Sequence, residues 1–203
     1  MSNSEQNSNT GSNDLLGRHI AVWGTTGSGK STLGAHLSAS LGLARVELDG
    51  LRHARGWDSV GYPEMAKQLE ARLDAATNGW VIDGNYRKVH SAYLARIDTL
   101  ILLRYPLRVT FPQLLKRTLL RSLTGRELYG PGGPRERLST QLFGRDSLLL
   151  YAIVTHRQKS EKLLRLARAQ PEHVRLHIVT TPRALIELLS RAGVPFIAAQ
   201  SRG

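Results

Sequence analysis

A glycine-rich loop near the start of the chain limits its possible folds more than any other feature. The residues Gly24-Thr25-Thr26-Gly27-Ser28-Gly29-Lys30-Ser31 fill the pattern G-x-x-x-x-G-K-[ST]. The loop directly follows the apolar, β-rich run 19–23 and precedes an amphipathic helical pattern over 31–37. In this context of strand, loop and helix, the pattern is typical of a P-loop, which binds the phosphates of a nucleotide.

The residue types of the loop suit that chemistry. Glycines let consecutive backbone N–H groups turn toward a polyphosphate, Lys30 reaches the β- and γ-phosphates, and the Ser31 hydroxyl ligates Mg²⁺. The helix that begins at about Gly29 adds the positive end of its dipole. We therefore expect Mg²⁺ and ATP as ligands. The predicted nucleotide-binding residues are Gly24, Thr25, Thr26, Gly27, Ser28, Gly29, Lys30, Ser31 and Thr32.

Short β-like runs alternate with longer helical patterns from Gly17 onward, which favours a parallel sheet with helices on both faces. We expect strands near 19–23, 44–48, 79–82, 98–103 and 174–179. We expect helices near 30–41, 63–77, 88–95, 106–123, 147–169 and 182–192. The sequence thus predicts an α/β protein with the three-layer α/β/α P-loop NTPase fold and a five-stranded parallel sheet.

Length and composition favour one domain of 203 residues. We expect a disordered N-terminal tail over 1–16, because Ser, Asn, Gln and Gly dominate its first part, a P-loop domain over 17–193 and a C-terminal tail over 194–203. The chain has no cysteine, which excludes disulfides and thiolate metal sites and fits a reducing cytoplasm. Its apolar runs are too short to span a bilayer, so we expect a cytoplasmic protein without a membrane partner.

Asp83 is the second candidate for chemistry, because it ends the apolar run Trp80-Val81-Ile82. Ligands of an open α/β sheet bind beyond the carboxyl ends of the strands, so this carboxylate should face the same crevice as the P-loop. P-loop enzymes use a strand-end Asp to hold Mg²⁺, and we favour this catalytic role. The alternative is an Asp that starts an Asp-Gly turn.

Asp49 follows the strand-like run 45–48 and should project into the crevice from the strand next to the P-loop strand. A carboxylate there could take the proton of an acceptor hydroxyl, whereas an acceptor that is already a phosphate needs no strong base. A helix cap or turn role has similar weight. Residues from about 49 to 78 are predicted to bind the acceptor: Arg52 and His53 could hold an anion, and Trp57 could stack on a base. The alternatives are a surface or structural role for His53 and ordinary packing in an inserted helix for Trp57.

The region from Arg104 to Arg145 is strongly basic, and its middle is rich in glycine and proline. We predict a short arginine-rich lid over about 122–146. Arginines on a lid can close over a triphosphate and stabilise the transferring phosphoryl group. A solvated basic face is the alternative for any single arginine of the region.

Several runs together resemble the small P-loop kinase-like proteins known as bacterial topology modulation proteins, which are similar to adenylate and shikimate kinases. The likeness spans roughly residues 18–183. Besides the P-loop, it rests on Glu47-Leu48-Asp49, Trp80-Val81-Ile82-Asp83-Gly84-Asn85-Tyr86, Tyr105-Pro106-Leu107 and Phe143-Gly144-Arg145-Asp146-Ser147. It implies an ATP-dependent phosphotransferase architecture.

The resemblance also implies roles for single residues. In adenylate kinases the strand-end acid lies in an Asp-Gly-x-Pro-Arg run, which 83–87 resembles, although Tyr86 replaces the proline; Arg87 would then touch the acceptor. Adenine would stack near Arg121 and residues 180–183. The arginines that approximately match the lid positions of adenylate kinases, with altered spacing, are Arg121, Arg126, Arg145 and Arg157. Of these, Arg157 is also expected to contact the acceptor.

Two classes of function remain open. The first is a kinase that moves the γ-phosphoryl group of ATP to a small acceptor such as a nucleoside, a nucleotide or a hydroxylated metabolite. The second is a nucleic-acid-associated ATPase or a nucleotide-dependent regulatory protein, which the net charge of +12 motivates. No recognised nucleic-acid module accompanies that charge. The chain could act as a monomer or a homodimer.

Overall fold

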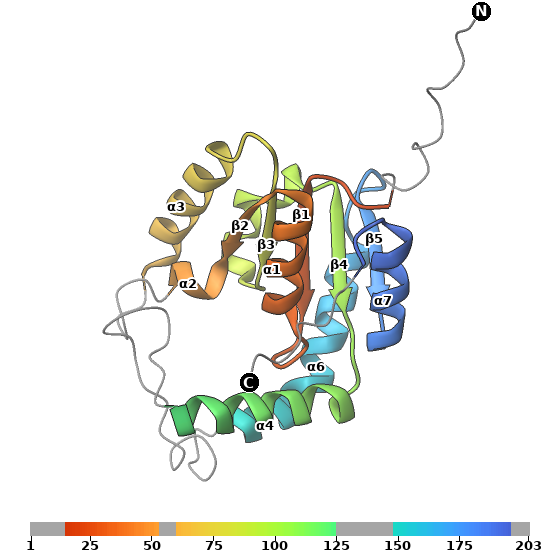
Figure 1. Cartoon of the computed structure of the whole chain (residues 1–203). Coiled ribbons are helices and arrows are strands. Elements are labelled where there is room, and N and C mark those ends of the chain that lie inside the picture. The colour runs from red at the N-terminus through yellow and green to blue at the C-terminus, as the bar shows by residue number, and fades with distance from the viewer. Residues whose placement is uncertain (1–14, 53–59, 125–147, 196–203) are drawn as a thin grey trace, which may run out of the picture.

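A parallel sheet of five strands forms the centre of the computed structural model, which describes residues 15–52, 60–124 and 148–195 (Figure 1). The strands stand in the order β2-β3-β1-β4-β5. Their bounds are β1 His19–Gly24, β2 Ala44–Glu47, β3 Trp80–Asp83, β4 Thr99–Leu103 and β5 Arg175–Val179. All five predicted strands are present, so the predicted fold class is confirmed.

The strand register brings the chemically important strand ends to one edge of the sheet. Val22 of β1 pairs with Asp83 of β3, and Asp83 in turn pairs with Glu47 of β2. On the other side of β1, Gly24 pairs with Leu103 at the end of β4. The P-loop therefore leaves the sheet at the level where β3 presents its terminal carboxylate.

Within the described residues, six α-helices and two short 3₁₀ helices accompany the strands. Their bounds are α1 Lys30–Leu41, α2 Leu48–Arg52, α3 Tyr62–Asp74, η1 Arg87–Ala92, η2 Leu94–Arg96, α4 Leu107–Thr124, α6 Leu148–Arg168 and α7 Pro182–Arg191. Local sequence explains several ends. Gly42 stops α1 in the left-handed conformation, and the Thr181 hydroxyl caps α7 by accepting a hydrogen bond from the Ala184 N–H.

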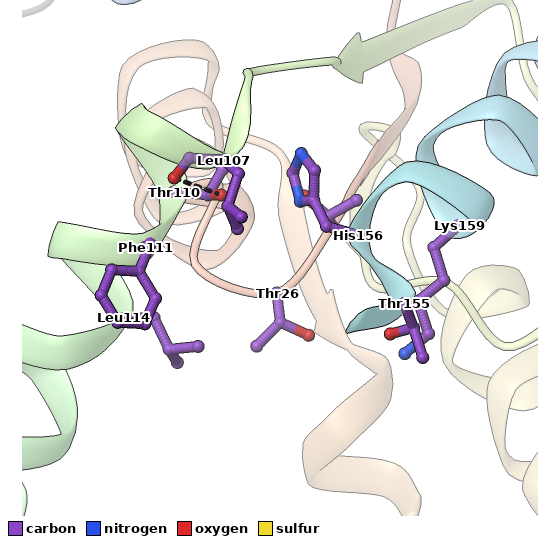
Figure 2. Close-up of a pocket in the computed structure, with 9 residues that line it drawn as sticks. Thr26, Leu107, Thr110, Phe111, Leu114, Thr155, His156 and Lys159 are labelled. Atoms are coloured by element: carbon purple, nitrogen blue, oxygen red, sulfur yellow. Dashed lines mark hydrogen bonds between the residues drawn. The ribbon is translucent and has the colours of Figure 1, made fainter. Parts of the chain in front are cut away.

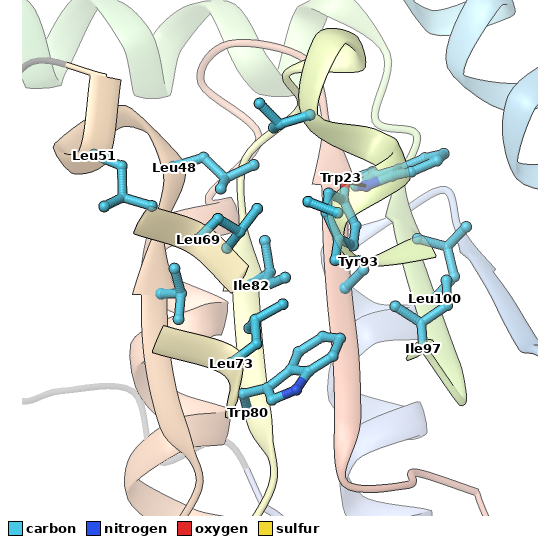
Figure 3. Close-up of a cluster of buried hydrophobic side chains, with 14 of the residues drawn as sticks. Trp23, Leu48, Leu51, Leu69, Leu73, Trp80, Ile82, Tyr93, Ile97 and Leu100 are labelled. Atoms are coloured by element: carbon cyan, nitrogen blue, oxygen red, sulfur yellow. Dashed lines mark hydrogen bonds between the residues drawn. The ribbon is translucent and has the colours of Figure 1, made fainter. Parts of the chain in front are cut away.

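The helices cover both faces of the sheet, because side chains of each buried strand alternate between the faces. On one face Trp23, Ile82 and Leu100 lie in one cluster with Leu69 and Leu73 of α3 (Figure 3). Residues of η1 and α6 belong to the same cluster. On the other face Val22 and Ile101 pack with α1 and α7. These two apolar layers hold the sheet edge that carries the P-loop in place.

The structure corrects some boundaries. The helix expected near 88–95 is two 3₁₀ turns, whose threefold repeat buries both His90 and Tyr93. Helix α2 was not expected. Leu16 and Val194 were expected in the tails but are buried in the core. Both belong to the apolar cluster that also contains residues of α1 and α7.

No helix among the described residues combines the length and the apolar character needed to cross a membrane.

Candidate active site

The P-loop joins the end of β1 to the start of α1 in a conformation that depends on its glycines. Gly27 and Gly29 both have positive φ angles, of 80° and 84°. A Cβ atom on Gly27 would lie 2.5 Å from the Thr110 carbonyl oxygen of α4, whereas one on Gly29 would meet no atom within 4 Å. The loop is therefore packed against α4 at Gly27 and open at Gly29, where a phosphate can approach the backbone.

Helices α4 and α6 hold the tip of the loop from two sides (Figure 2). Thr26 lies between Leu107, Thr110, Phe111 and Leu114 of α4 and Thr155, His156 and Lys159 of α6. The free volume among these side chains is about 10 Å³, which is too small for a ligand. A ring nitrogen of His156 lies 3.1 Å from the Tyr105 carbonyl oxygen and ties α6 to the start of α4.

Asp83 and Ser31 meet as the P-loop pattern predicts. The Ser31 hydroxyl donates a hydrogen bond of 2.9 Å to Asp83 Oδ1. The second oxygen, Oδ2, accepts from Arg45 of β2 at 3.0 Å from Nε and 2.9 Å from Nη2. Because the Asp83 side chain is only 2% exposed, these partners set the orientation of the carboxylate.

This pair suits Mg²⁺. A hydroxyl and a carboxylate oxygen stand side by side, and oxygen ligands are the ones that Mg²⁺ prefers. Within the described ranges, no group of three or more His, Cys, Asp or Glu side chains could hold a metal ion. Mg²⁺ bound here would take its remaining ligands from phosphate oxygens and water, as is usual at phosphoryl-transfer sites.

Lys30 points back over the loop, where its ammonium donates a hydrogen bond of 3.0 Å to the Thr25 carbonyl oxygen. Burial lowers the pKa of Lys30 to about 8, and the nearby Asp49 carboxylate opposes that shift. Arg117 and Lys159 lower the pKa further, because they place positive charge near the ammonium. The site thus concentrates cations around the position where a triphosphate would lie.

Two hydroxyls in the loop are buried without a partner. Thr25 Oγ1 and Ser28 Oγ neither donate nor accept a hydrogen bond within the described part of the chain, although both residues are less than a tenth exposed. Buried polar groups are rarely left in this state, and a functional site is one of the common reasons.

Two cavities open from the loop and share Lys30 and Asp49. The first, of about 490 Å³, lies toward α4; it is lined by Thr26, Gly27, Gly29, Lys30, Ser31, Thr32, Asp49, Gln113, Lys116, Arg117 and Leu120. The second, of about 300 Å³, lies toward η1 and α6; it is lined by Gly24, Thr25, Thr26, Lys30, Asp49, Gly84, Asn85, Tyr86, Arg87, His90, Lys159, Lys162, Leu163 and Leu166. We name them the phosphate-side cavity and the α6-side cavity.

Asp49 lines the site from helix α2, and the prediction that it projects from the strand next to the P-loop strand is wrong. The expected neighbour of the P-loop strand was β2, but β3 lies between β2 and β1. The strand ends at Glu47, and Asp49 belongs to the first turn of α2. It lines both cavities because α2, and not the strand, carries it to the shared edge of the sheet.

The other predicted acceptor residues have different outcomes. Arg87 lines the α6-side cavity, whereas the Arg52 guanidinium lies 4.4 Å from the Tyr62 ring centroid and lines neither cavity. Arg157 is exposed on α6 and also lines neither. His53 and Trp57 lie outside the described residues.

The expected lid falls largely outside the described residues. Arg126 and Arg145 are among those not described, and Arg121 is described only as part of the last turns of α4. Their roles stay predictions.

Several residues of the site escaped the sequence analysis. Arg45 contacts Asp83 from β2, the strand directly beside β3, and Lys159 and Lys162 line the α6-side cavity where Arg157 was expected. Helical periodicity could have identified the two lysines. Counted from Lys159, the residues Lys162, Leu163 and Leu166 follow at three, four and seven positions, so all four lie on one face of α6. Arg157 is two residues before Lys159 and lies on another face.

A third cavity, of about 300 Å³, adjoins the P-loop between α1, α4 and α7. Ser28, Gly29 and Thr32 form its loop side. Its other lining residues are mostly apolar, namely Leu33, Tyr105, Gln113, Pro182, Leu185 and Ile186. Pro182 belongs to the segment 180–183 that the family resemblance associates with adenine. We name this space the α7-side cavity.

Comparisons with known proteins return distant matches. The family model described as DUF87, Helicase HerA, central domain, matches residues 1–46 of the 203, which is too small a part to place the chain in that family. No curated protein matches. Among solved structures, an unliganded sugar kinase from Janibacter sp. HTCC2649 matches over 87% of this chain and 95% of that chain, with 18% identity and a TM-score of 0.47. Function must therefore be argued from the site.

Proposed function

We propose that this chain is a Mg²⁺-dependent phosphotransferase that moves the γ-phosphoryl group of ATP to a small acceptor. One observation carries the proposal: Lys30 and Asp49 line both of two adjoining cavities, and Ser31, whose hydroxyl is hydrogen-bonded to Asp83, lines one of them. A donor and an acceptor can therefore meet at one point, from two sides. A protein that only binds a nucleotide needs no second cavity there.

The residues of the loop would hold the triphosphate. Backbone N–H groups around Gly27 and Gly29 turn toward the phosphates, and Lys30 leaves the Thr25 carbonyl to contact the β- and γ-phosphates. Bound Mg²⁺ neutralises charge that develops during transfer. Ser31 and Asp83 would hold it, with Arg45 keeping Asp83 in place.

Asp49 would act on the acceptor. Its carboxylate takes the proton as the acceptor hydroxyl oxygen bonds to the γ-phosphorus, and the bond from that phosphorus to the β–γ bridging oxygen breaks, so that ADP leaves. Asp49 stands on the boundary of the two cavities, next to Lys30, which is where such a base must lie.

The nucleobase would occupy the α7-side cavity. That space adjoins Gly29 and Thr32 of the phosphate site, and its mostly apolar wall suits the flat face of a purine. Among the residues that line this cavity, Tyr105 and Pro182 have ring surfaces on which a base could stack. The sequence-based expectation of adenine near 180–183 agrees with this placement.

The direct test measures ADP production from Mg·ATP with a panel of acceptors. The panel contains nucleosides, nucleoside monophosphates, small hydroxylated metabolites and oligonucleotides with a 5′-hydroxyl group. We expect one class to stimulate turnover and to yield a phosphorylated product in mass spectrometry. Asp83→Asn should keep nucleotide binding and lose most of the Mg²⁺-dependent turnover.

Slow turnover that no acceptor changes, together with tight nucleotide binding, would contradict the phosphotransferase. It would favour the second candidate, a nucleic-acid-associated ATPase or nucleotide-dependent regulatory protein. Two observations support that candidate: the net charge of +12 and the match of residues 1–46 to the HerA central-domain model. Its own test is DNA or RNA binding at physiological salt, which should weaken steeply as the salt concentration rises.

A further inference from the structure

The α6-side cavity has a strongly unbalanced charge. Among the residues that the structure describes, four cations line it and Asp49 is the single acid; the cations are Lys30, Arg87, Lys159 and Lys162. Lys30 also belongs to the phosphate-side cavity, and Lys159 contributes to the wall beside Thr26. Arg87 and Lys162 line the α6-side cavity and neither of the other spaces around the loop. They are therefore the charges that characterise it.

Neither of these two cations has an acidic partner among the described residues. Other arginines of the same structure are paired: Arg45 with Asp83, Arg96 with Asp74, Arg104 with Glu161 and Arg183 with Glu187. Arg87 and Lys162 come from different walls, the first from the start of η1 and the second from the middle of α6. Two unpaired cations facing one cavity favour an anionic ligand there.

The remaining wall does not neutralise that charge. His90 is 8% exposed, and its ring stacks on Trp23 with centroids 4.9 Å apart. Burial and, to a lesser degree, Arg87 lower the pKa of His90 to about 4, so the imidazole is neutral near pH 7. Its Nε2 has no hydrogen-bond partner within the described ranges. Tyr86, Leu163 and Leu166 add largely apolar surface.

We propose that the α6-side cavity binds the phosphoryl acceptor and that this acceptor is a hydroxylated anion, whose own carboxylate or phosphate monoester is bound by Arg87 and Lys162. Its hydroxyl group then lies at Asp49, on the boundary with the phosphate-side cavity. This inference rests on the proposed function. The two ends of the acceptor then have different roles: the hydroxyl end reacts, and the anionic end binds to the cations and positions the molecule.

The first experiment measures anion binding to the nucleotide-loaded protein. The full chain is saturated with Mg²⁺ and a non-hydrolysable ATP analogue, so that the P-loop is filled, and inorganic phosphate is titrated by calorimetry. Arg87→Gln and Lys162→Gln should each raise the dissociation constant of phosphate about tenfold, since each removes a charge-assisted contact. The controls are Lys88→Gln and Arg165→Gln, each close in sequence to its counterpart but outside the cavity wall; they should stay within about twofold.

The second experiment compares acceptors in neutral and anionic pairs: glycerol with glycerate, and ribose with ribose 5-phosphate. We expect kcat/KM to favour the anionic member of at least one pair about tenfold or more, and Lys162→Gln to remove that preference while Arg165→Gln keeps it. Glycerate tests a carboxylate and ribose 5-phosphate a phosphate monoester, so the two sources of charge are distinguished.

The inference is overturned if the loaded protein binds no phosphate, if the controls weaken phosphate as much as the cavity variants do, or if neutral acceptors react as well as anionic ones. In each of these cases binding of the ATP analogue is retained, and the proposed phosphotransferase stands. Failure of the analogue to bind, or of any acceptor to be phosphorylated, would instead contradict the proposed function. Thermal unfolding of each variant shows that it is folded.

Discussion

The phosphate-side and α6-side cavities share Lys30 and Asp49 but are built differently. Just over half of the residues that line the phosphate side belong to the P-loop and the start of α1, which offer backbone N–H groups and Lys30, while α4 adds Lys116 and Arg117. The α6 side is assembled from the P-loop, α2, the segment after β3, η1 and α6, and it presents side chains. Backbone dipoles suit a ligand that is the same in every P-loop protein, whereas side chains suit a ligand that differs from one protein to the next.

The most severe effect should come from Lys30, because both cavities depend on it. Lys30→Ala removes the cation that we propose to contact the transferring phosphoryl group, so we expect turnover of Mg·ATP to fall by about 10³-fold or more and triphosphate binding to weaken. Lys67→Ala, on the exposed side of α3, is the matched control and should change neither. Undiminished turnover in Lys30→Ala would show that the P-loop does not carry the chemistry.

Asp49→Asn tests the boundary between the two cavities, because it removes only the proposed base beside the reacting group of the acceptor. If the acceptor group is a hydroxyl, the loss of the base should lower kcat about 10²-fold, while the dissociation constant of the ATP analogue stays within about twofold. Single-turnover kinetics and calorimetry measure the two effects separately. A kcat close to that of the unchanged protein would indicate an acceptor group that needs no base, such as a phosphate.

Two P-loop glycines allow a matched test of how the loop is packed. Gly27→Ala places a Cβ 2.5 Å from the Thr110 carbonyl oxygen and retains a φ of 80°, so it should lower the free energy of unfolding by about 3 kcal/mol. Gly29→Ala has a similar φ but open space around it, and it should cost about 1 kcal/mol. Urea unfolding measures both. Equal losses would show that contact with α4 does not shape the loop.

The smallest effect concerns protons. Because burial lowers the pKa of Lys30 from 10.5 to about 8, the unfolded chain binds more protons between these pH values, and the contribution of Lys30 to stability rises with pH across that window. A bound triphosphate should restore the charged form. Binding of the Mg·ATP analogue at pH 8.5 should then take up about 0.8 proton, against about 0.1 at pH 7.0.

Calorimetry in two buffers of different ionisation enthalpy measures this uptake. Equal uptake at both pH values would mean that Lys30 is already charged in the free protein, and that Asp49 outweighs burial at this site.

The P-loop, the five strands, the fold class and the meeting of Ser31 with the acid that ends β3 could all be predicted from the sequence. These features depend on neighbouring residues, on strand-length apolar runs and on the rule that parallel strands end at one edge of the sheet. A short stretch of chain contains each of these signals, so no knowledge of long-range packing was needed.

Which side chains line the α6-side cavity depends on tertiary packing. The strand order placed β3 between β2 and β1, so Arg45 meets Asp83 and Asp49 arrives on α2. The rotation of α6 brought Lys162 to the cavity and left Arg157 in solvent. Strand order and helix rotation are set by packing between segments far apart in the chain, and a local pattern does not contain that information.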